Sequence, residues 1–137
     1  MTEIITRLKT VWDSRPEVLF VYIFGSSVKG MINPESDIDI AVYLKDEINP
    51  ADFIFSVMPE IVHRTKYDKL DLVILNKAPL SLRYIIQKEG VLIFERSKEH
   101  RIDFEVRTRL SFWDFEPHLR VYESYMFKRV EEGSFGT

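Results

Sequence analysis

Three aspartates are the residues whose types and positions best suit catalysis. Asp37 and Asp39 open a segment that continues as the apolar run 40–44, and Asp71 interrupts a second apolar run, 70–75. Because side chains alternate along a strand, Asp37 and Asp39 leave the same face with Cα atoms about 6.6 Å apart. Two carboxylates at that separation can share a divalent cation. An unpaired carboxylate inside an apolar strand costs several kcal/mol unless a cation compensates it. We therefore expect the three acids to form a metal cluster on adjacent strands.

A Gly-Ser pair precedes the acids at a defined spacing. Gly25 and Ser26 end the uncharged run 18–24, and ten residues separate Ser26 from Asp37. An Asp-x-Asp pair standing alone at a strand start is more often a solvated strand end. The full four-residue pattern arises by chance in a chain of this composition on the order of one time in a thousand. The combination therefore indicates a functional site and not a chance arrangement of residues.

Other chemistries of an Asp-x-Asp pair fit the flanking residues poorly. An EF-hand loop needs a further oxygen ligand and then a glycine, whereas Ile40 and Ala41 follow Asp39. In phosphatases and glycosyltransferases whose acids end a strand, the apolar run precedes the acids, and here it follows them. The chain contains neither G-x-x-x-x-G-K-[ST] nor G-x-G-x-x-G, so these two phosphate loops are excluded.

The pattern Gly25-Ser26-x10-Asp37-x-Asp39, with Asp71 on a later strand, resembles the signature of the DNA polymerase β nucleotidyltransferase superfamily. The short length and the helical tail make the chain similar to the minimal nucleotidyltransferases, and the resemblance covers essentially all of it. Members of that group are commonly antitoxin partners of HEPN-domain ribonuclease toxins. Those studied transfer AMP from ATP to a tyrosine of the toxin. The resemblance thus implies a polymerase β-like nucleotidyltransferase fold and a HEPN partner.

The resemblance also implies a role for each motif residue. Gly25 would let backbone N–H groups approach the triphosphate of ATP, and Ser26 would donate its hydroxyl to a phosphate. Asp37 and Asp39 would bind Mg²⁺. Asp71 would complete a two-metal site and accept the proton of the attacking hydroxyl, although the sequence does not separate these two functions.

Three more residues of the segment after Gly25 are candidates for the nucleotide site. Ser27 adjoins the motif. Lys29 could contact a phosphate, although a solvated lysine is the more common case for a loop. Ser36 could support the metal site or could cap the loop.

The hydrophobic pattern predicts strands that alternate with helices. This order predicts an α+β domain with a two-layer α/β arrangement, in which helices pack on a small mixed sheet of about four strands. The chain is expected to end in a helical C-terminal tail. The expected elements are a helix over 2–13, a strand over 18–24, a strand over 37–44, a helix starting at Asn49-Pro50, a strand over 69–75, a helix between Pro79 and Gly90, a strand over 91–94, and two helices over 97–132 that break near Pro117.

Composition excludes several classes of function. The 137 residues are 45% hydrophobic and 30% charged, which predicts one compact domain over 1–137. The absence of cysteine excludes thiol chemistry, favours oxygen ligands and hence Mg²⁺ over zinc, and suits a reducing cytoplasm. No segment is apolar enough for a signal peptide or membrane span. The net charge of −3 gives no basic surface for a polynucleotide.

The tail over about 97–132 is a candidate partner surface, because 8 of the 18 aromatic residues lie in the last 34 positions, with arginines among them. Packing of two helices against the sheet is the alternative explanation for these aromatics.

Three functions stay open at this point. The first is a Mg²⁺-dependent adenylyltransferase that forms a hetero-oligomer with a HEPN toxin and modifies a toxin tyrosine. The second is nucleotidyl transfer to a small hydroxylated molecule, such as an aminoglycoside. The third is a non-catalytic antitoxin that acts by occlusion. The sequence names neither the acceptor residue, nor the base preference, nor the stoichiometry.

Overall fold

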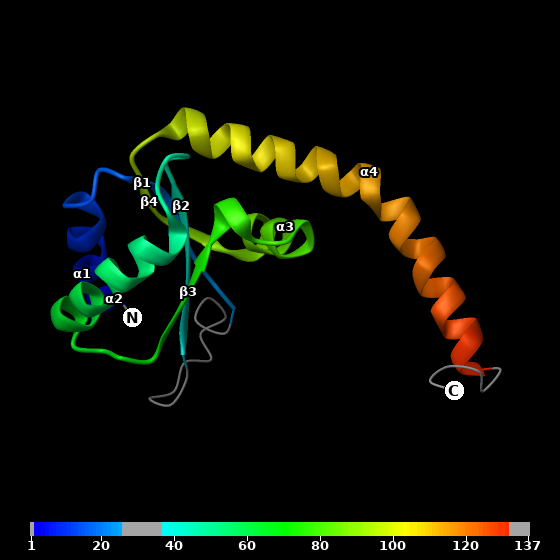
Figure 1. Ribbon diagram of the computed structural model, residues 1–137, viewed down its shortest axis with the longest axis horizontal. Coiled ribbons are helices and arrows are strands. Elements are labelled where there is room, and N and C mark those ends of the chain that lie inside the picture. Colours follow the sequence, from blue (N-terminus) through cyan, green and yellow to red (C-terminus); the bar gives the residue numbers. More distant parts are fainter. Residues whose placement is uncertain (1, 26–36, 132–137) are drawn as a thin grey trace.

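The computed structural model describes the backbone of residues 2–25 and 37–131 and the side chains of residues 3–25 and 37–114. Figure 1 shows a sheet with helices on both sides and one long helix at the end of the chain. In chain order, the elements are α1 (Thr2–Asp13), β1 (Val18–Phe24), β2 (Ile38–Leu44), α2 (Pro50–Thr65), β3 (Leu70–Ile74), the 3-10 turn η2 (Leu75–Lys77), α3 (Leu80–Glu89), β4 (Val91–Glu95) and α4 (Lys98–Glu131).

The sheet is mixed, and its strand order is β3-β2-β1-β4. β1 pairs antiparallel with both β2 and β4, whereas β2 and β3 run parallel. The central position of β1 explains its uncharged sequence, because almost every residue of this strand is buried. The predicted four-stranded mixed sheet of an α+β domain is confirmed.

Helices cover both faces of this sheet, so the fold has three layers where we expected two. On one face α1 and α2 form a core with the strands that includes Trp12, Ile40 and Ile61. On the other face Phe20 of β1 meets Ile86 of α3 and Phe104 of α4 in a second core. The second layer of helices is needed because β1 and β2 are apolar on both faces.

α4 is one continuous helix, whereas we expected two helices broken near Pro117. A proline removes one intrahelical hydrogen bond, but α4 continues through this residue. α2 likewise contains Pro59 within its bounds. Within the part of the chain that the structure describes, no helix is both long and apolar enough to cross a membrane.

A polar network attaches the first turns of α4 to the sheet. The buried Tyr22 hydroxyl of β1 donates a hydrogen bond to the Glu105 carboxylate of α4. Burial and this carboxylate raise the pKa of Tyr22, so the hydroxyl stays protonated. Arg101 binds Glu105 at 3.1 Å and also pairs with Glu95 at the end of β4. These bonds fix the start of α4, and the rest of the helix extends past α3 and away from the sheet (Figure 1).

Candidate active site

The motif residues meet at one edge of the sheet. In the parallel pairing of β2 and β3, Asp39 lies opposite Asp71. In the antiparallel pairing of β1 and β2, Phe24 lies opposite Asp39, so Gly25 follows directly beside the acids. Three strands therefore bring Gly25, Asp39 and Asp71 to the same edge of the sheet.

Alternation along β2 separates the core residues from the acids. Ile38, Ile40 and Val42 are buried in the core under α1 and α2. Asp39 is half-buried and shares the opposite face with Ala41, which belongs to the second core. The carboxylate of Asp39 thus emerges on the sheet face that α3 and α4 cover.

Gly25 and Asp39 are in direct steric contact. The backbone of Gly25 has φ +73°, in the left-handed region that side chains rarely adopt. A Cβ atom added there would lie 2.3 Å from Oδ2 of Asp39, which is far inside van der Waals contact. Glycine is therefore required at this position both by the backbone conformation and by the approach of the carboxylate.

Burial and two neighbouring acids disfavour the charged form of Asp39. Partial burial raises the pKa of its carboxyl, and the negative charges of Asp71 and Asp37 raise it further. Three carboxylates that repel one another suit a divalent cation, which prefers oxygen ligands. Among the described residues, however, no group of three or more His, Cys, Asp or Glu side chains is placed to hold a metal ion, so the metal site of Asp37, Asp39 and Asp71 stays a prediction.

The structure corrects one step of the sequence argument. We expected Asp71 to be desolvated among apolar neighbours, but Asp71 is exposed, because β3 is an edge strand of the sheet. Burial therefore gives no reason for a cation at this residue. The reason is its register opposite Asp39, which places two acids side by side.

The segment between Gly25 and Asp37 supplies the remaining candidates, which are Ser26, Ser27, Lys29 and Ser36. All four lie outside the described residues. Their proposed contacts with the nucleotide stay predictions.

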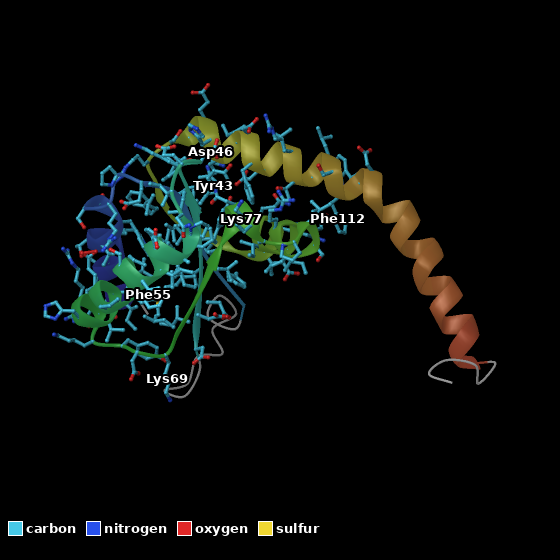
Figure 2. All side chains as sticks on the ribbon, in the orientation of Figure 1. Tyr43, Asp46, Phe55, Lys69, Lys77 and Phe112 are labelled. Atoms are coloured by element: carbon cyan, nitrogen blue, oxygen red, sulfur yellow. The ribbon has the colours of Figure 1, made fainter. Side chains whose placement is uncertain are left out.

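The structure adds Lys69 to this edge. Its backbone carbonyl accepts a hydrogen bond of 2.8 Å from the N–H of Ile38, so Lys69 lies beside the start of β2. Alternation from Asp71 places Lys69 on the same face as the acids. Figure 2 shows Lys69 at this lower end of the sheet. Its position two residues before Asp71 was a signal in the sequence that we did not use.

Comparison with known proteins gives consistent results. Residues 6–99 match the family model described as Polymerase beta, Nucleotidyltransferase. The protein adenylyltransferase MntA of Aphanizomenon flos-aquae (strain 2012/KM1/D3) is 28% identical to the chain over 104 residues, which cover 70% of this chain and 69% of that protein.

Solved structures share the fold at low identity. A crystal structure of a toxin-antitoxin with AMP-PNP has a chain with TM-score 0.71 and 23% identity, and the match covers 96% of this chain and 99% of that chain. A chain of the tri-AMPylated Shewanella oneidensis HEPN toxin in complex with MNT antitoxin has TM-score 0.66 and 21% identity, covering 95% and 98%. These similarities establish the architecture.

Proposed function

Because the chain belongs to the polymerase beta nucleotidyltransferase family, we propose that it transfers AMP from ATP to a tyrosine of a cognate HEPN-domain toxin, as a Mg²⁺-dependent antitoxin enzyme. The observation that carries this proposal is the juxtaposition of Gly25, Asp39 and Asp71 at one sheet edge. The names of two similar proteins support it, since one is a protein adenylyltransferase and the other belongs to a complex of an MNT antitoxin with a tri-AMPylated HEPN toxin.

The chemistry follows from the oxygen donors at this edge. Asp37, Asp39 and Asp71 would hold Mg²⁺, which neutralises phosphate charge and orients the reacting groups when it is bound. Asp71, the most exposed position on the edge strand, accepts the proton as the tyrosine oxygen attacks the α-phosphorus. The bond between the α-phosphorus and its bridging oxygen breaks, and pyrophosphate leaves. The absence of a side chain at Gly25 leaves room for the Asp39 carboxylate, and the backbone N–H groups of this turn would bind the phosphates.

The acceptor is a protein that binds to the chain, and not a polynucleotide. A net charge of −3 provides no basic groove for nucleic acid. We place this complex in the cytoplasm, where ATP is available. A chain without cysteine has no disulfides that the reducing conditions there would break.

A stripe of exposed apolar side chains on α4 provides the docking surface. Ile102, Val106, Leu110 and Trp113 are spaced as i, i+4, i+8 and i+11, and their exposed fractions are 38–56%. This spacing places them along one side of the helix, turned away from the side on which Phe104 and Thr108 are buried. Such a stripe is the usual contact of one helix with another. We refer to these four residues as the α4 stripe.

The occupant of the α4 stripe is a helix of the HEPN partner. Four half-exposed side chains offer less than the ~800 Å² per partner that a stable interface buries, so the stripe alone does not support a dimer of this chain. A partner that also places its tyrosine at the sheet edge that carries Asp39 and Asp71 buries additional surface there.

Adding two charges to the α4 stripe should abolish partner binding. We expect the double variant Leu110→Glu, Trp113→Glu to lose at least a hundredfold in affinity for the HEPN protein, because large apolar anchors dominate interfaces. Its unfolding temperature should stay near that of the wild type, since both side chains are exposed. Ser111→Glu is the matched control, because it adds a charge on the same turns outside the stripe. Binding can be measured by calorimetry.

The outcomes of this test are distinct. Equal affinity of the double variant and the Ser111→Glu control would contradict the assignment. A wild-type dimer that dissociates in the double variant would show that the stripe binds a second copy instead.

The test of the proposed reaction uses ATP labelled at the α-phosphate. Purified chain, Mg²⁺ and the HEPN protein encoded beside it should yield label on the HEPN protein. Label that appears only on an added aminoglycoside would favour transfer to a small molecule. A stable complex without label would favour occlusion.

A further inference from the structure

A cavity of about 230 Å³ lies at the end of β2 that is remote from the acids. Its walls come from β2 and the loop that follows it, the start of α2, η2, α3 and the first turns of α4. Figure 2 shows Tyr43, Asp46 and Lys77 at this upper end of the sheet, whereas Lys69 marks the acidic edge at the lower end. Tyr43 is four residues from Asp39, which corresponds to about 13 Å along a strand. The cavity is therefore separate from the proposed nucleotide site.

The frame of this cavity is rigid. The ring of Tyr43 stacks on Phe20 with centroids 4.8 Å apart and also contacts Phe104 of α4. The Asn76 side chain accepts a hydrogen bond of 2.9 Å from the Leu44 N–H and donates one of 2.8 Å to the Leu44 carbonyl. These contacts tie the end of β2 to η2 and α4, so the cavity walls are fixed before any ligand binds.

Positive charges converge on the cavity from three elements. Lys77 of η2, Arg83 of α3 and Arg107 of α4 all line it. Arg107 pairs with Asp103 at 3.1 Å on its own helix. No ion pair within the described residues engages Lys77 or Arg83, and Asp46 is the remaining acid in the lining. The lining is therefore net positive in a chain of net charge −3.

Two buried polar atoms in the lining residues have no partner within the described structure. They are Nε of Arg83 and Oγ1 of Thr108, a residue with an exposed fraction of 1%. Thr65 in α2 shows the ordinary arrangement, because its hydroxyl donates to the Ile61 carbonyl one turn earlier at 2.7 Å. A buried N–H or hydroxyl without a partner costs free energy. Both groups can donate, so the missing partner is an acceptor.

We propose that this cavity is a binding site for a small oxyanion, a phosphate or a carboxylate, held by Arg83 and Lys77 and distinct from the nucleotide site. Guanidinium groups bind such oxyanions through paired hydrogen bonds. The volume of about 230 Å³ admits a small ion with a few waters, and it lies below the range typical of larger ligands. This site is independent of the proposed transfer reaction.

The test is a titration of the full chain, followed by NMR, with inorganic phosphate and, separately, malonate, against sodium chloride of equal ionic strength. At least one of the two should cause saturable shifts in the signals of Leu44, Thr108 and the Asn76 side-chain amide. Arg83→Gln should weaken this binding about tenfold or more, because a charge-assisted pair is lost. Lys88→Gln, on the exposed side of the same helix, is the matched control and should bind as the wild type does.

Two further variants keep the proposal falsifiable. Lys77→Gln removes an exposed charge and should weaken binding even if Arg83→Gln fails to fold. Asp39→Asn should leave these shifts unchanged, because the two sites are at opposite ends of β2. Shifts no larger than those with chloride would overturn the proposal. So would equal binding by the wild type and both cavity variants, or shifts confined to the signals of Gly25 and its neighbours.

Discussion

Replacing Asp39 with asparagine is expected to lower the rate of AMP transfer about a thousandfold or more. Asp39 lies between Gly25 and Asp71 at the acidic edge, and an amide is a far weaker ligand for a divalent cation than a carboxylate. A metal ion contributes several kcal/mol of charge stabilisation, and each 1.36 kcal/mol is a factor of ten in rate. The rate of pyrophosphate release with the HEPN partner measures the loss.

The same substitution should not destabilise the fold. The pKa of Asp39 is raised by burial and by the charges of Asp71 and Asp37, so the charged form is disfavoured in the folded state. Removing that charge should leave the unfolding temperature in Mg²⁺-free buffer at or slightly above the wild-type value. Asp13→Asn, at the exposed end of α1, is the control and should keep both rate and stability. A stable Asp39→Asn variant that still transfers AMP at the normal rate would show that Asp39 is not part of the active site.

Replacing Gly25 with alanine is the second substitution with a large expected effect. The new Cβ would lie 2.3 Å from Oδ2 of Asp39, and the φ of +73° would strain an alanine. The carboxylate must move, and a displacement of about 1 Å in a catalytic group costs on the order of a hundredfold in rate. Strain in the left-handed region adds roughly 1–2 kcal/mol to the cost of folding. Transfer assays and thermal unfolding measure the two effects separately.

A second variant separates the two causes. Gly25→Asn also carries a Cβ, but asparagine tolerates the left-handed conformation better than alanine does. If the contact with Asp39 limits the rate, both variants should lose activity to a similar extent, while Gly25→Asn should be the more stable protein. Near-normal transfer by both variants would show that the approach of Asp39 to Gly25 is not required.

Much of the fold was predictable from local patterns. β1 was evident as an uncharged run that ends at Gly25, and Asn49 caps α2 through a hydrogen bond of 3.1 Å from the N–H of Asp52, as the Asn-Pro sequence indicated. The Asp-x-Asp pair and Asp71 were recognisable as candidate site residues, because acids are unusual in apolar runs. These features depend on neighbouring residues, so one sequence contains enough information to find them.

The errors concern features that depend on distant parts of the chain. Strand order decides whether a strand lies at an edge, so the exposure of Asp71 could not be inferred from the apolar residues around it. The third layer depends on where α3 and α4 fold back, which helical periodicity does not specify. The break expected at Pro117 treated proline as a helix terminator, but one helix continues through this residue, as α2 continues through Pro59.

The cavity under α4 could not be predicted from the sequence, because it too depends on contacts between distant parts of the chain. Arg83, Lys77 and Thr108 come from three elements, and no spacing in the sequence relates them. Their convergence follows from the packing of α3 and α4 against the end of β2.

Mass spectrometry of the HEPN partner, after incubation with the chain, ATP and Mg²⁺, tests the central proposal most directly. We predict that the partner gains one or more adenylyl groups on tyrosine, that pyrophosphate is released in equal amount, and that the Asp39→Asn variant produces neither. A partner that binds the chain tightly but keeps its original mass would contradict the assignment of the chain as a protein adenylyltransferase.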